Sequence, residues 1–298
     1  MNRKIHRYSE ADARKIIKYF LDEGSFSEIF PPTERLVSPN LVALDLPVQF
    51  DDGVVTGIGK LNRNTVFMAA QQGAFDGGSI GEVQAAKLVG LLKRAQRDKP
   101  AAVIFAFDSG GVRLHEANIG LIAVAELVRA VLDTRSAGIP CIAMIGGNVG
   151  CYGGASIAAK CFDHVIMSER GRLGVSGPIV IETVLGVEEF DSKDRALVWR
   201  TFGGRHRYIT GDADEFADDD IASFREIASG LLNPPEELTL DALKKEHRIL
   251  AERYEKFGNS RTACDIWKVL GVGDSSSISM TDANSFREKC AAARSEKL

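Results

Sequence analysis

The chain has 298 residues, of which 45% are hydrophobic and 26% are charged, a composition typical of a folded globular protein with a sizeable core. Its formal net charge is −4 at pH 7, which argues against nucleic acid or an anionic membrane surface as a partner. The start of the chain lacks the apolar segment of a signal peptide, and the longest apolar run, residues 101–107, is far too short to span a membrane. The five cysteines include no C-x-x-C pair, so we expect a cytoplasmic protein without a disulfide framework or a zinc ribbon.

The first predicted elements are a helix, a β-hairpin and a second helix. Residues 9–24 (SEADARKIIKYFLDEG) predict a helix that Ser9 caps and Gly24 ends. Two strand-like segments, 54–61 and 65–70, flank a polar turn and predict the hairpin. Residues 79–98 predict a long helix, in which Ser79 and Glu82 have the spacing of a capping box.

Buried strands and helices then alternate. Strands are expected at 101–108, 139–145 and from 163 onward, with helices ending near Asp133 and following the glycine-rich stretch 146–154. Short apolar strands separated by helices indicate a largely parallel sheet with both faces covered, and therefore an α/β fold. Beyond residue 191 the chain is expected to be mostly helical, with a break at Pro234 and Pro235.

Three glycine-rich loops, opening at Gly77, Gly110 and Gly150, each connect a predicted strand to a predicted helix. Such loops present unpaired backbone N–H groups, which attract a phosphate, a carboxylate or an oxyanion that develops in a transition state. The alternative is that the glycines serve only tight turns and close packing. Because ligands of such folds lie beyond the carboxyl ends of the strands, three loops at one end of the sheet favour a binding site.

Other sites are weakly supported by the sequence. There is no P-loop, and the glycines of 146–154 lack the dinucleotide-binding spacing. No pair of histidines has metal-ligand spacing, so no metal site is expected; the histidines are His6, His115, His164, His206 and His247. Residues 77–81 match the G-x-S-x-G motif of serine hydrolases, but eight loop residues separate Ser79 from the preceding strand, so a helix cap is favoured.

Four further residues near the loops have more than one interpretation. His115 and Glu116 follow the second loop and could face a site, although a solvated helical turn is favoured. Cys151 lies in the third loop without an evident base and is expected to be a small buried side chain. Its neighbour Tyr152 is a candidate proton donor or contact for a carrier arm.

The order of motifs resembles the carboxyltransferase branch of the crotonase superfamily. The segments that carry the resemblance are GAFDGGSIG, SGGVRLHE, GGNVGCYGGASIA and RGRLGVSGPIVIE, preceded by YFLDEGSFSEI, and together they cover about residues 14–190. The chain most resembles β subunits of biotin-independent malonate decarboxylase, because it lacks the zinc-binding cysteines of the acetyl-CoA carboxylase β subunit. The resemblance implies stacked ββα units over residues 1–235 and a helical C-terminal extension over 236–298.

The resemblance also implies roles for particular residues. In this family, backbone amides hold the carbonyl oxygen of a malonyl-type thioester, and the matching catalytic positions here are Gly110, Gly111, Val112, Gly153 and Gly154. Substrate-binding positions are expected at Gly77, Gly78, Ser79, Tyr152, Gly177 and Pro178. At 174–178, Val175 and Ser176 replace the pair that is commoner in the family.

The implied function is a carbon–carbon lyase subunit that converts malonyl-S-carrier to acetyl-S-carrier and CO₂. No directly bound cofactor is expected. The substrate would be attached as a thioester to the phosphopantetheine-type, dephospho-CoA-derived arm of an acyl carrier protein. A homologous γ subunit would complete the site. The alternatives are the β subunit of a biotin-dependent acetyl- or propionyl-CoA carboxyltransferase, a serine hydrolase using Ser79, and a non-catalytic subunit that only shapes its partner's site.

Overall fold

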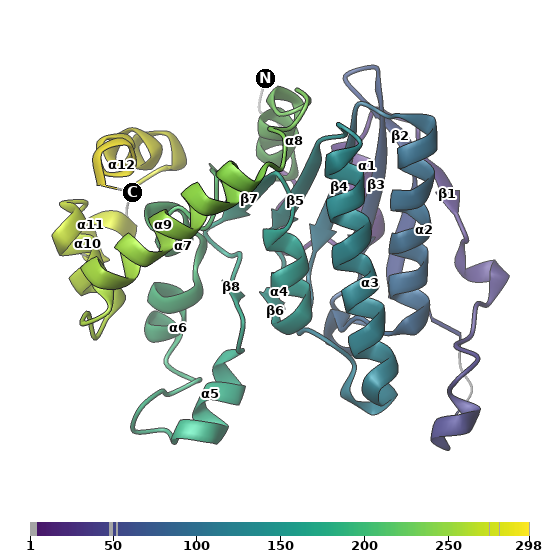
Figure 1. Cartoon of the computed structure of the whole chain (residues 1–298), viewed down its shortest axis with the longest axis horizontal. Helices are drawn as coiled ribbons and strands as arrows, with labels where there is room; N and C mark the ends of the chain where they lie inside the picture. Colours follow the sequence, from purple (N-terminus) through teal and green to yellow (C-terminus); the bar gives the residue numbers. More distant parts are fainter. Residues whose placement is uncertain (1–4, 48–49, 52, 274, 280, 298) are drawn as a thin grey trace.

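The computed structural model describes residues 5–47, 50–51, 53–273, 275–279 and 281–297. Within these residues a seven-stranded sheet forms the centre of the molecule, in the order β1-β2-β3-β4-β5-β7-β9 (Figure 1). β1, β2 and β3 are antiparallel, and every neighbour from β3 to β9 is parallel. The strands are β1 (Ser27–Ile29), β2 (Val54–Leu61), β3 (Asn64–Gln71), β4 (Ala102–Phe107), β5 (Cys141–Ile145), β7 (His164–Ser168) and β9 (Glu215–Ala217).

The predicted hairpin and the predicted parallel core are both confirmed. Leu61 pairs with Asn64 across a two-residue turn in which Asn62 and Arg63 both have positive φ, the geometry that suits the twist of a tight hairpin. Every residue of β4 and β5 is buried, as expected for strands covered on both faces.

Helices cover the two faces of the sheet. On one face, α2 (Glu82–Asp98), α3 (Ala117–Ser136) and α4 (Gly153–Lys160) pack against side chains such as Phe105 and Ala143. On the other face, α1 (Ala13–Phe20) and α8 (Ile221–Gly230) pack against Ile104 and Met144. Adjacent residues of one strand therefore point into different cores, which is the two-residue period of a β-strand.

A second, two-stranded sheet lies beside the main one. β6 (Cys151–Tyr152) pairs in parallel with β8 (Leu173–Gly174), and Ser109 forms a parallel bridge with Cys151. The chain continues into α5 (Pro178–Leu185), α6 (Arg195–Phe202) and α7 (Gly204–Ile209). Short 3₁₀ turns occur at Pro32–Glu34, Val42–Leu44, Asp76–Gly78 and Leu114–Glu116.

The C-terminal part is helical, as expected, and packs against α7 and β9. It comprises α9 (Leu240–Phe257), α10 (Ala263–Leu270), α11 (Ser275–Ser279) and α12 (Ala283–Lys297). Trp267 and Phe286 share a core with Tyr208 and Phe216, and the Arg294 guanidinium donates to the carbonyl oxygen of Tyr208 at 2.9 Å. The predicted boundary after residue 235 falls in the irregular segment between α8 and α9 and stays a prediction.

The first helix is shorter than the sequence suggests. α1 begins after Asp12, whose carboxylate accepts a hydrogen bond from the Lys15 N–H at 2.8 Å, and it ends at Phe20. The predicted cap Ser9 instead donates its hydroxyl to Asp219 at 2.7 Å, and the predicted end Gly24 lies beyond the helix. Asp12, three positions downstream of Ser9, is therefore the N-cap of this helix. Serine and aspartate are both good N-caps, so either residue fits the local pattern.

None of the helices in the described ranges is both long and apolar enough to cross a bilayer.

Candidate active site

The three glycine-rich loops meet at one edge of the main sheet. They follow β3, β4 and β5, which are parallel neighbours, so their carboxyl ends lie side by side. The Gly110 N–H donates to the Gly77 carbonyl oxygen at 2.8 Å. Gly78 approaches the second loop so closely that a Cβ there would lie 1.8 Å from the Asp108 carbonyl oxygen. The first loop therefore needs glycine at position 78 to reach the second.

Two backbone hydrogen bonds connect Ile80 to the residues on either side of Val112. The Ile80 N–H donates to the Gly111 carbonyl at 2.8 Å, and the Ile80 carbonyl accepts from the Arg113 N–H at 3.0 Å. These bonds form a short parallel bridge between Ile80 and Val112. The peptide groups on both sides of Val112 are thereby fixed relative to the first loop.

The third loop lies against the second in the same way. The Ser109 N–H donates to the Gly150 carbonyl at 2.6 Å, and the Tyr152 N–H donates to the Ser109 carbonyl at 3.0 Å. The Asp108 carboxylate adds a side-chain connection, since its Oδ1 accepts from the N–H groups of Val149 and Gly150 at 2.8 and 3.2 Å. Burial raises the pKa of the Asp108 carboxyl above its ordinary value.

Not all of the predicted amides are available to a ligand. The Gly110 N–H is bound to Gly77, the Gly111 N–H donates to Ser109 Oγ at 3.2 Å, and the Gly153 N–H donates to the Val175 carbonyl at 2.9 Å. In the described part of the chain, the N–H groups of Val112 and Gly154 have no hydrogen-bond acceptor.

The two unpaired amides lie on touching loops. A Cβ on Gly154 would be 2.7 Å from a methyl group of Val112, and a Cβ on Gly111 would be 3.5 Å from the Gly153 Cα. Gly154 is in the first turn of α4, where backbone N–H groups have no intrahelical partner. Both unpaired N–H groups therefore belong to adjoining backbone segments at the loop edge of the sheet.

The predicted capping box at Ser79 and Glu82 is wrong. α2 begins at Glu82 with Gly81 as its N-cap, and the Ser79 hydroxyl donates to the Asp76 carbonyl at 2.6 Å. The Glu82 N–H is capped instead by Glu116, whose Oε2 accepts it at 2.7 Å. Ser79 thus makes neither the cap nor a contact with a general base among the described residues.

Other predicted residues take definite places. Glu116 is buried, so its interpretation as part of a solvated turn is wrong, whereas His115 is exposed. Cys151 is buried, as expected, and burial raises the pKa of its thiol. Gly177 is the N-cap of α5, with Pro178 as its first residue.

The side chain of Tyr152 is buried. It is 6% exposed and packs against Phe202, with ring centroids 5.7 Å apart. A Cβ on Gly177 would lie 3.9 Å from its ring. Burial raises the pKa of the Tyr152 hydroxyl to about 12.

Sequence reasoning missed Asp108 and Arg113, the two charged residues that flank the second loop. Arg113 is 4% exposed and forms ion pairs with Asp51 and Glu116 at 2.6 and 3.0 Å. An available signal was a charged residue on each side of the sequence SGGV, directly after an apolar strand. No group of three or more His, Cys, Asp or Glu suited to a metal occurs in the described ranges.

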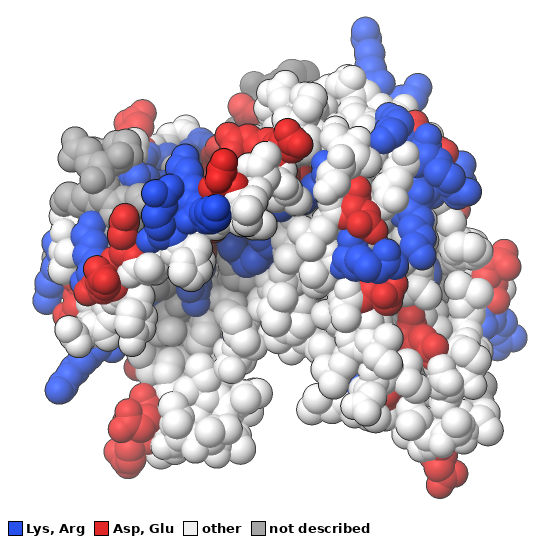
Figure 2. Space-filling view, in the orientation of Figure 1, with Lys and Arg blue, Asp and Glu red and all other residues white. Residues whose placement is uncertain are grey.

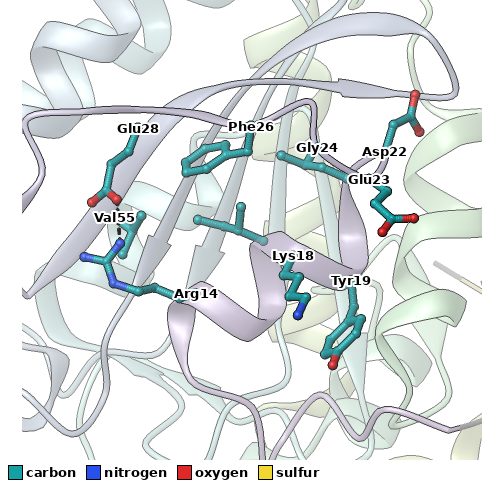
Figure 3. Close-up of a pocket in the computed structure, with 11 residues that line it drawn as sticks. Arg14, Lys18, Tyr19, Asp22, Glu23, Gly24, Phe26, Glu28 and Val55 are labelled. Carbon is teal, nitrogen blue, oxygen red and sulfur yellow. Dashed lines mark hydrogen bonds and ion pairs between the residues drawn. The ribbon is translucent and has the colours of Figure 1, made fainter.

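Two hollows can be compared with this site. A cavity of about 500 Å³ lies between α1 and the β1–β2 edge, but no predicted site residue lines it (Figure 3). Figure 2 shows a second hollow low in the view, between the lobe that carries α5 and the lobe that carries the lower end of α3. Apolar side chains are exposed on both elements, namely Ile179, Val180, Val184 and Leu185 on α5 and Leu121 and Ile122 on α3.

The sequence matches a known protein family over most of its length. Residues 6–270 match the family model described as "Carboxyl transferase domain". The chain is 43% identical over 244 residues to the malonyl-S-ACP:biotin-protein carboxyltransferase of Malonomonas rubra, covering 77% of this chain and 76% of that protein. It is 34% identical to a putative propionyl-CoA carboxylase β chain of Bacillus subtilis, covering 67% of this chain and only 37% of that protein.

Solved structures agree with the sequence matches. A malonate decarboxylase hetero-tetramer of Pseudomonas, in complex with malonate, contains a chain that matches with a TM-score of 0.73 and 37% identity, over 82% of this chain and 91% of that one. A chain of a malonate decarboxylase hetero-dimer of Pseudomonas matches with a TM-score of 0.65 and 33% identity, over 82% and 96%. The expected crotonase-like α/β fold is confirmed, and the chain belongs to the carboxyl transferase domain family.

Proposed function

We propose that the chain is a carboxy-lyase subunit that acts on a malonyl thioester of an acyl carrier protein and produces the acetyl thioester and CO₂. The observation that carries this proposal is the pair of unpaired amides of Val112 and Gly154 on two adjoining loops. A thioester carbonyl placed there becomes an enolate oxygen as the carboxylate leaves.

Decarboxylation places negative charge on the thioester oxygen. The bond between the α-carbon and the carboxylate breaks, CO₂ leaves, and the electron pair moves into the thioester as an enolate, which a proton then converts to the acetyl group. Because negative charge on the oxygen grows along this step, the amides of Val112 and Gly154 stabilise the transition state more than the substrate. Gly110, Gly111 and Gly153 shape the backbone that presents these donors.

The remaining predicted residues form the surroundings of this pair. We assign the edge formed by Gly77, Gly78 and Ser79 to the acyl group and its arm, because this loop is joined directly to Gly110 and Val112. Gly177 and Pro178 begin α5 beside Tyr152 and border the arm from the other side. Tyr152 then acts as the buried wall beneath them rather than as a proton donor.

The carrier would be an acyl carrier protein with a phosphopantetheine-type, dephospho-CoA-derived arm. The name of the Malonomonas relative specifies malonyl-S-ACP as its carboxyl donor, which supports this substrate over the acyl-CoA thioesters of the acetyl- and propionyl-CoA carboxylases. That name also specifies a biotin protein as acceptor, whereas the Pseudomonas structures are called malonate decarboxylases. The fate of the carboxyl group is therefore what the experiment must decide.

A homologous γ subunit would complete the site, in the cytoplasm. The apolar side chains of Ile179 and Val184 on α5 are 71% and 74% exposed, and this helix begins within three residues of Val175, which binds the Gly153 N–H. Large exposed apolar patches mark protein interfaces. The structural relatives, a hetero-dimer and a hetero-tetramer, support a second subunit at this surface.

The test is to co-express the chain with the homologous subunit and to supply malonyl-S-carrier without biotin while CO₂ release is followed. Release at a saturable rate supports the decarboxylase. Turnover that begins only after a biotinylated acceptor is added supports the carboxyltransferase alternative. If acetyl-carrier in D₂O gains deuterium in its methyl group in either case, the enolate is formed regardless of which acceptor is used.

A further inference from the structure

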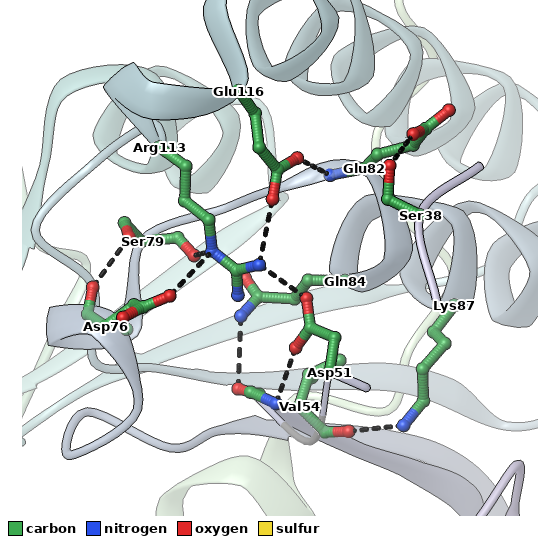
Figure 4. A network of polar contacts seen from close by, with 12 residues as sticks. Ser38, Asp51, Val54, Asp76, Ser79, Glu82, Gln84, Lys87, Arg113 and Glu116 are labelled. Carbon is green, nitrogen blue, oxygen red and sulfur yellow. Dashed lines mark hydrogen bonds and ion pairs between the residues drawn. The ribbon is translucent and has the colours of Figure 1, made fainter. Parts of the chain in front are cut away.

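A buried charge network surrounds Arg113, the residue that follows Val112 in the sequence (Figure 4). At its centre is the Arg113 guanidinium, which donates to Asp51 at 2.6 Å and to Glu116 at 3.0 Å through one nitrogen. Its Nε donates to the Ser79 carbonyl at 3.1 Å and lies 3.8 Å from the Asp76 carboxylate. The guanidinium also stacks over Phe75 at 5.3 Å from the ring centroid.

This arrangement joins three segments that are far apart in the sequence. Asp51 comes from the irregular chain before β2, Ser79 and Asp76 come from the first glycine-rich loop, and Glu116 follows the second. Glu116 extends the connection to α2, because its second oxygen accepts from the Glu82 N–H. One cation therefore sets the distance between the first loop, the second loop and the start of α2.

The network uses two of the three guanidinium nitrogens: Nε binds a carbonyl and one terminal nitrogen binds two carboxylates, while the other terminal nitrogen has no hydrogen-bond partner among the described residues. The guanidinium presents several fixed N–H donors in a plane, so it can bind a carbonyl and two carboxylates together, while a lysine ammonium cannot reproduce that fork. Gly81 leaves room for it, since a Cβ there would lie 2.4 Å from a Glu116 oxygen and 2.7 Å from an Arg113 nitrogen. The carboxyl groups raise the pKa of Arg113 although burial opposes this.

We infer that Arg113 is a positioning residue, which holds the Val112 N–H in line with the Gly154 N–H by tying the second loop to the first. This inference rests on the proposed function only in that an oxyanion forms at those amides. Arg113 has no route to the substrate itself, since its side chain is 5% exposed. A displacement of about 1 Å at a reacting centre can cost about a hundredfold in rate, so loosening this connection should lower kcat.

A matched buried ion pair provides the control. Arg135 binds Asp163 at 2.5 Å, with 15% and 5% of the two side chains exposed, and also donates to the Cys161 carbonyl. Asp163 accepts from the Cys141 N–H, at the start of β5, the strand end opposite the glycine-rich loops. Loss of this pair should destabilise the protein without moving the amides.

The experiment compares Arg113→Met, Arg113→Lys and Arg135→Met in the complex with the partner subunit. Two rates are measured, CO₂ release from malonyl-carrier and deuterium exchange into acetyl-S-pantetheine, together with the unfolding temperature. We expect Arg113→Met to lower kcat and the exchange rate about a hundredfold relative to wild type, with KM within about threefold. Arg113→Lys should have both rates about tenfold higher than Arg113→Met, and therefore about tenfold below wild type. Arg135→Met should lower the unfolding temperature while both rates stay within about threefold.

Several outcomes would overturn the inference. If Arg113→Met lowers only the unfolding temperature, as Arg135→Met does, Arg113 is a structural ion pair. If Arg113→Met does not fold, Arg113→Lys decides, and unchanged rates in that variant refute a positioning role. A wild-type complex that exchanges deuterium but releases no CO₂ contradicts the proposed decarboxylation and leaves the role of Arg113 testable by exchange.

Discussion

The Asp108 carboxylate holds the backbone of Gly150, accepting its N–H at 3.2 Å while the same oxygen accepts the N–H of Val149 at 2.8 Å. Asp108 directly follows β4 and Gly150 precedes β6, so this contact aligns the second loop with the third. Together with Arg113, which joins the second loop to the first, it makes one rigid unit of all three loops. The two unpaired amides belong to this unit.

The Asp108 contact can be tested with Asp108→Asn and Asp108→Ala. The Asn oxygen can still accept both N–H groups, and its neutrality suits a site where burial disfavours the carboxylate. We expect Asp108→Asn to keep kcat within about fivefold, whereas Asp108→Ala, which leaves two partly buried donors without this acceptor, should lower it at least about tenfold. Equal rates in the two variants would show that the hydrogen bonds to the third loop are unimportant.

The backbone amide of Val112 can be removed by Val112→Pro, with Val112→Ala as the variant that keeps the N–H. Loss of one oxyanion donor typically costs about 3 kcal/mol, or a hundredfold or more in kcat. Val112→Ala should stay within about fivefold in the same CO₂ assay. Full activity of Val112→Pro would mean that this chain only shapes the site of its partner. Gly111 is unsuitable for such a test, because its φ of +125° excludes proline.

Substitution by alanine should affect stability and kcat differently at Gly77 and Gly78, which are adjacent in the first loop. Gly77 and Gly78 have φ values of +61° and +66°, so either substitution costs about 1 kcal/mol in backbone strain. A methyl group at position 77 meets open space, while at 78 it would collide with the Asp108 carbonyl. Urea unfolding should therefore show a clearly larger loss of stability for Gly78→Ala, and only that variant should lower kcat strongly. Similar losses would contradict the close approach of the two loops.

Ser79→Ala separates the lyase from a serine hydrolase. Since the hydroxyl of Ser79 donates to the Asp76 carbonyl and is not assigned to the reacting atoms, its removal should change kcat for CO₂ release by less than about threefold, with any effect of the binding edge confined to KM. A fluorophosphonate probe should leave wild-type Ser79 unlabelled in mass spectra of the digested protein. Labelling at Ser79, with loss of activity in the alanine variant, would support the hydrolase.

His206 should make stability depend on pH. It is buried and accepts a hydrogen bond from the Trp267 indole N–H at 3.1 Å, and burial lowers its pKa to about 3. Between about pH 6.5 and 3 the unfolded chain binds a proton that the folded chain does not, so stability falls as pH falls through this window. Wild type should lose about 2 kcal/mol more than His206→Gln between pH 7 and 5 in urea unfolding. Parallel losses in the two proteins would exclude His206 as the cause.

Local sequence patterns predicted much of the fold, because the hydrophobicity of a strand's own residues indicates whether the strand is buried. The hairpin at 54–71, the buried strands β4 and β5 and the helices after the loops all follow from segments of at most twenty residues. Helix starts were harder to predict. At α1 two good caps, Ser9 and Asp12, compete within four residues, and at α2 the acceptor Glu116 comes from a different part of the chain.

The site was predicted at the level of loops, not of individual amides. Glycine-rich sequence shows that backbone N–H groups are presented, but not which ones stay unpaired. Ser109 Oγ, two residues away in the same loop, accepts the Gly111 N–H, whereas the acceptor of the Gly153 N–H is the Val175 carbonyl from a distant segment. The second contact leaves no pattern in the local sequence, because it depends on how the segment after β8 lies beside the third loop.

The parallel order of β3, β4 and β5 also bears on how the protein acquires its activity. The loops that supply Val112 and Gly154 meet only after two crossover connections have closed and three strands have paired. Contacts between residues distant in the chain form slowly, since loop closure costs entropy before pairing repays it. A partly folded chain would therefore lack the proposed oxyanion site, and binding of an enolate-like inhibitor would report the completion of folding.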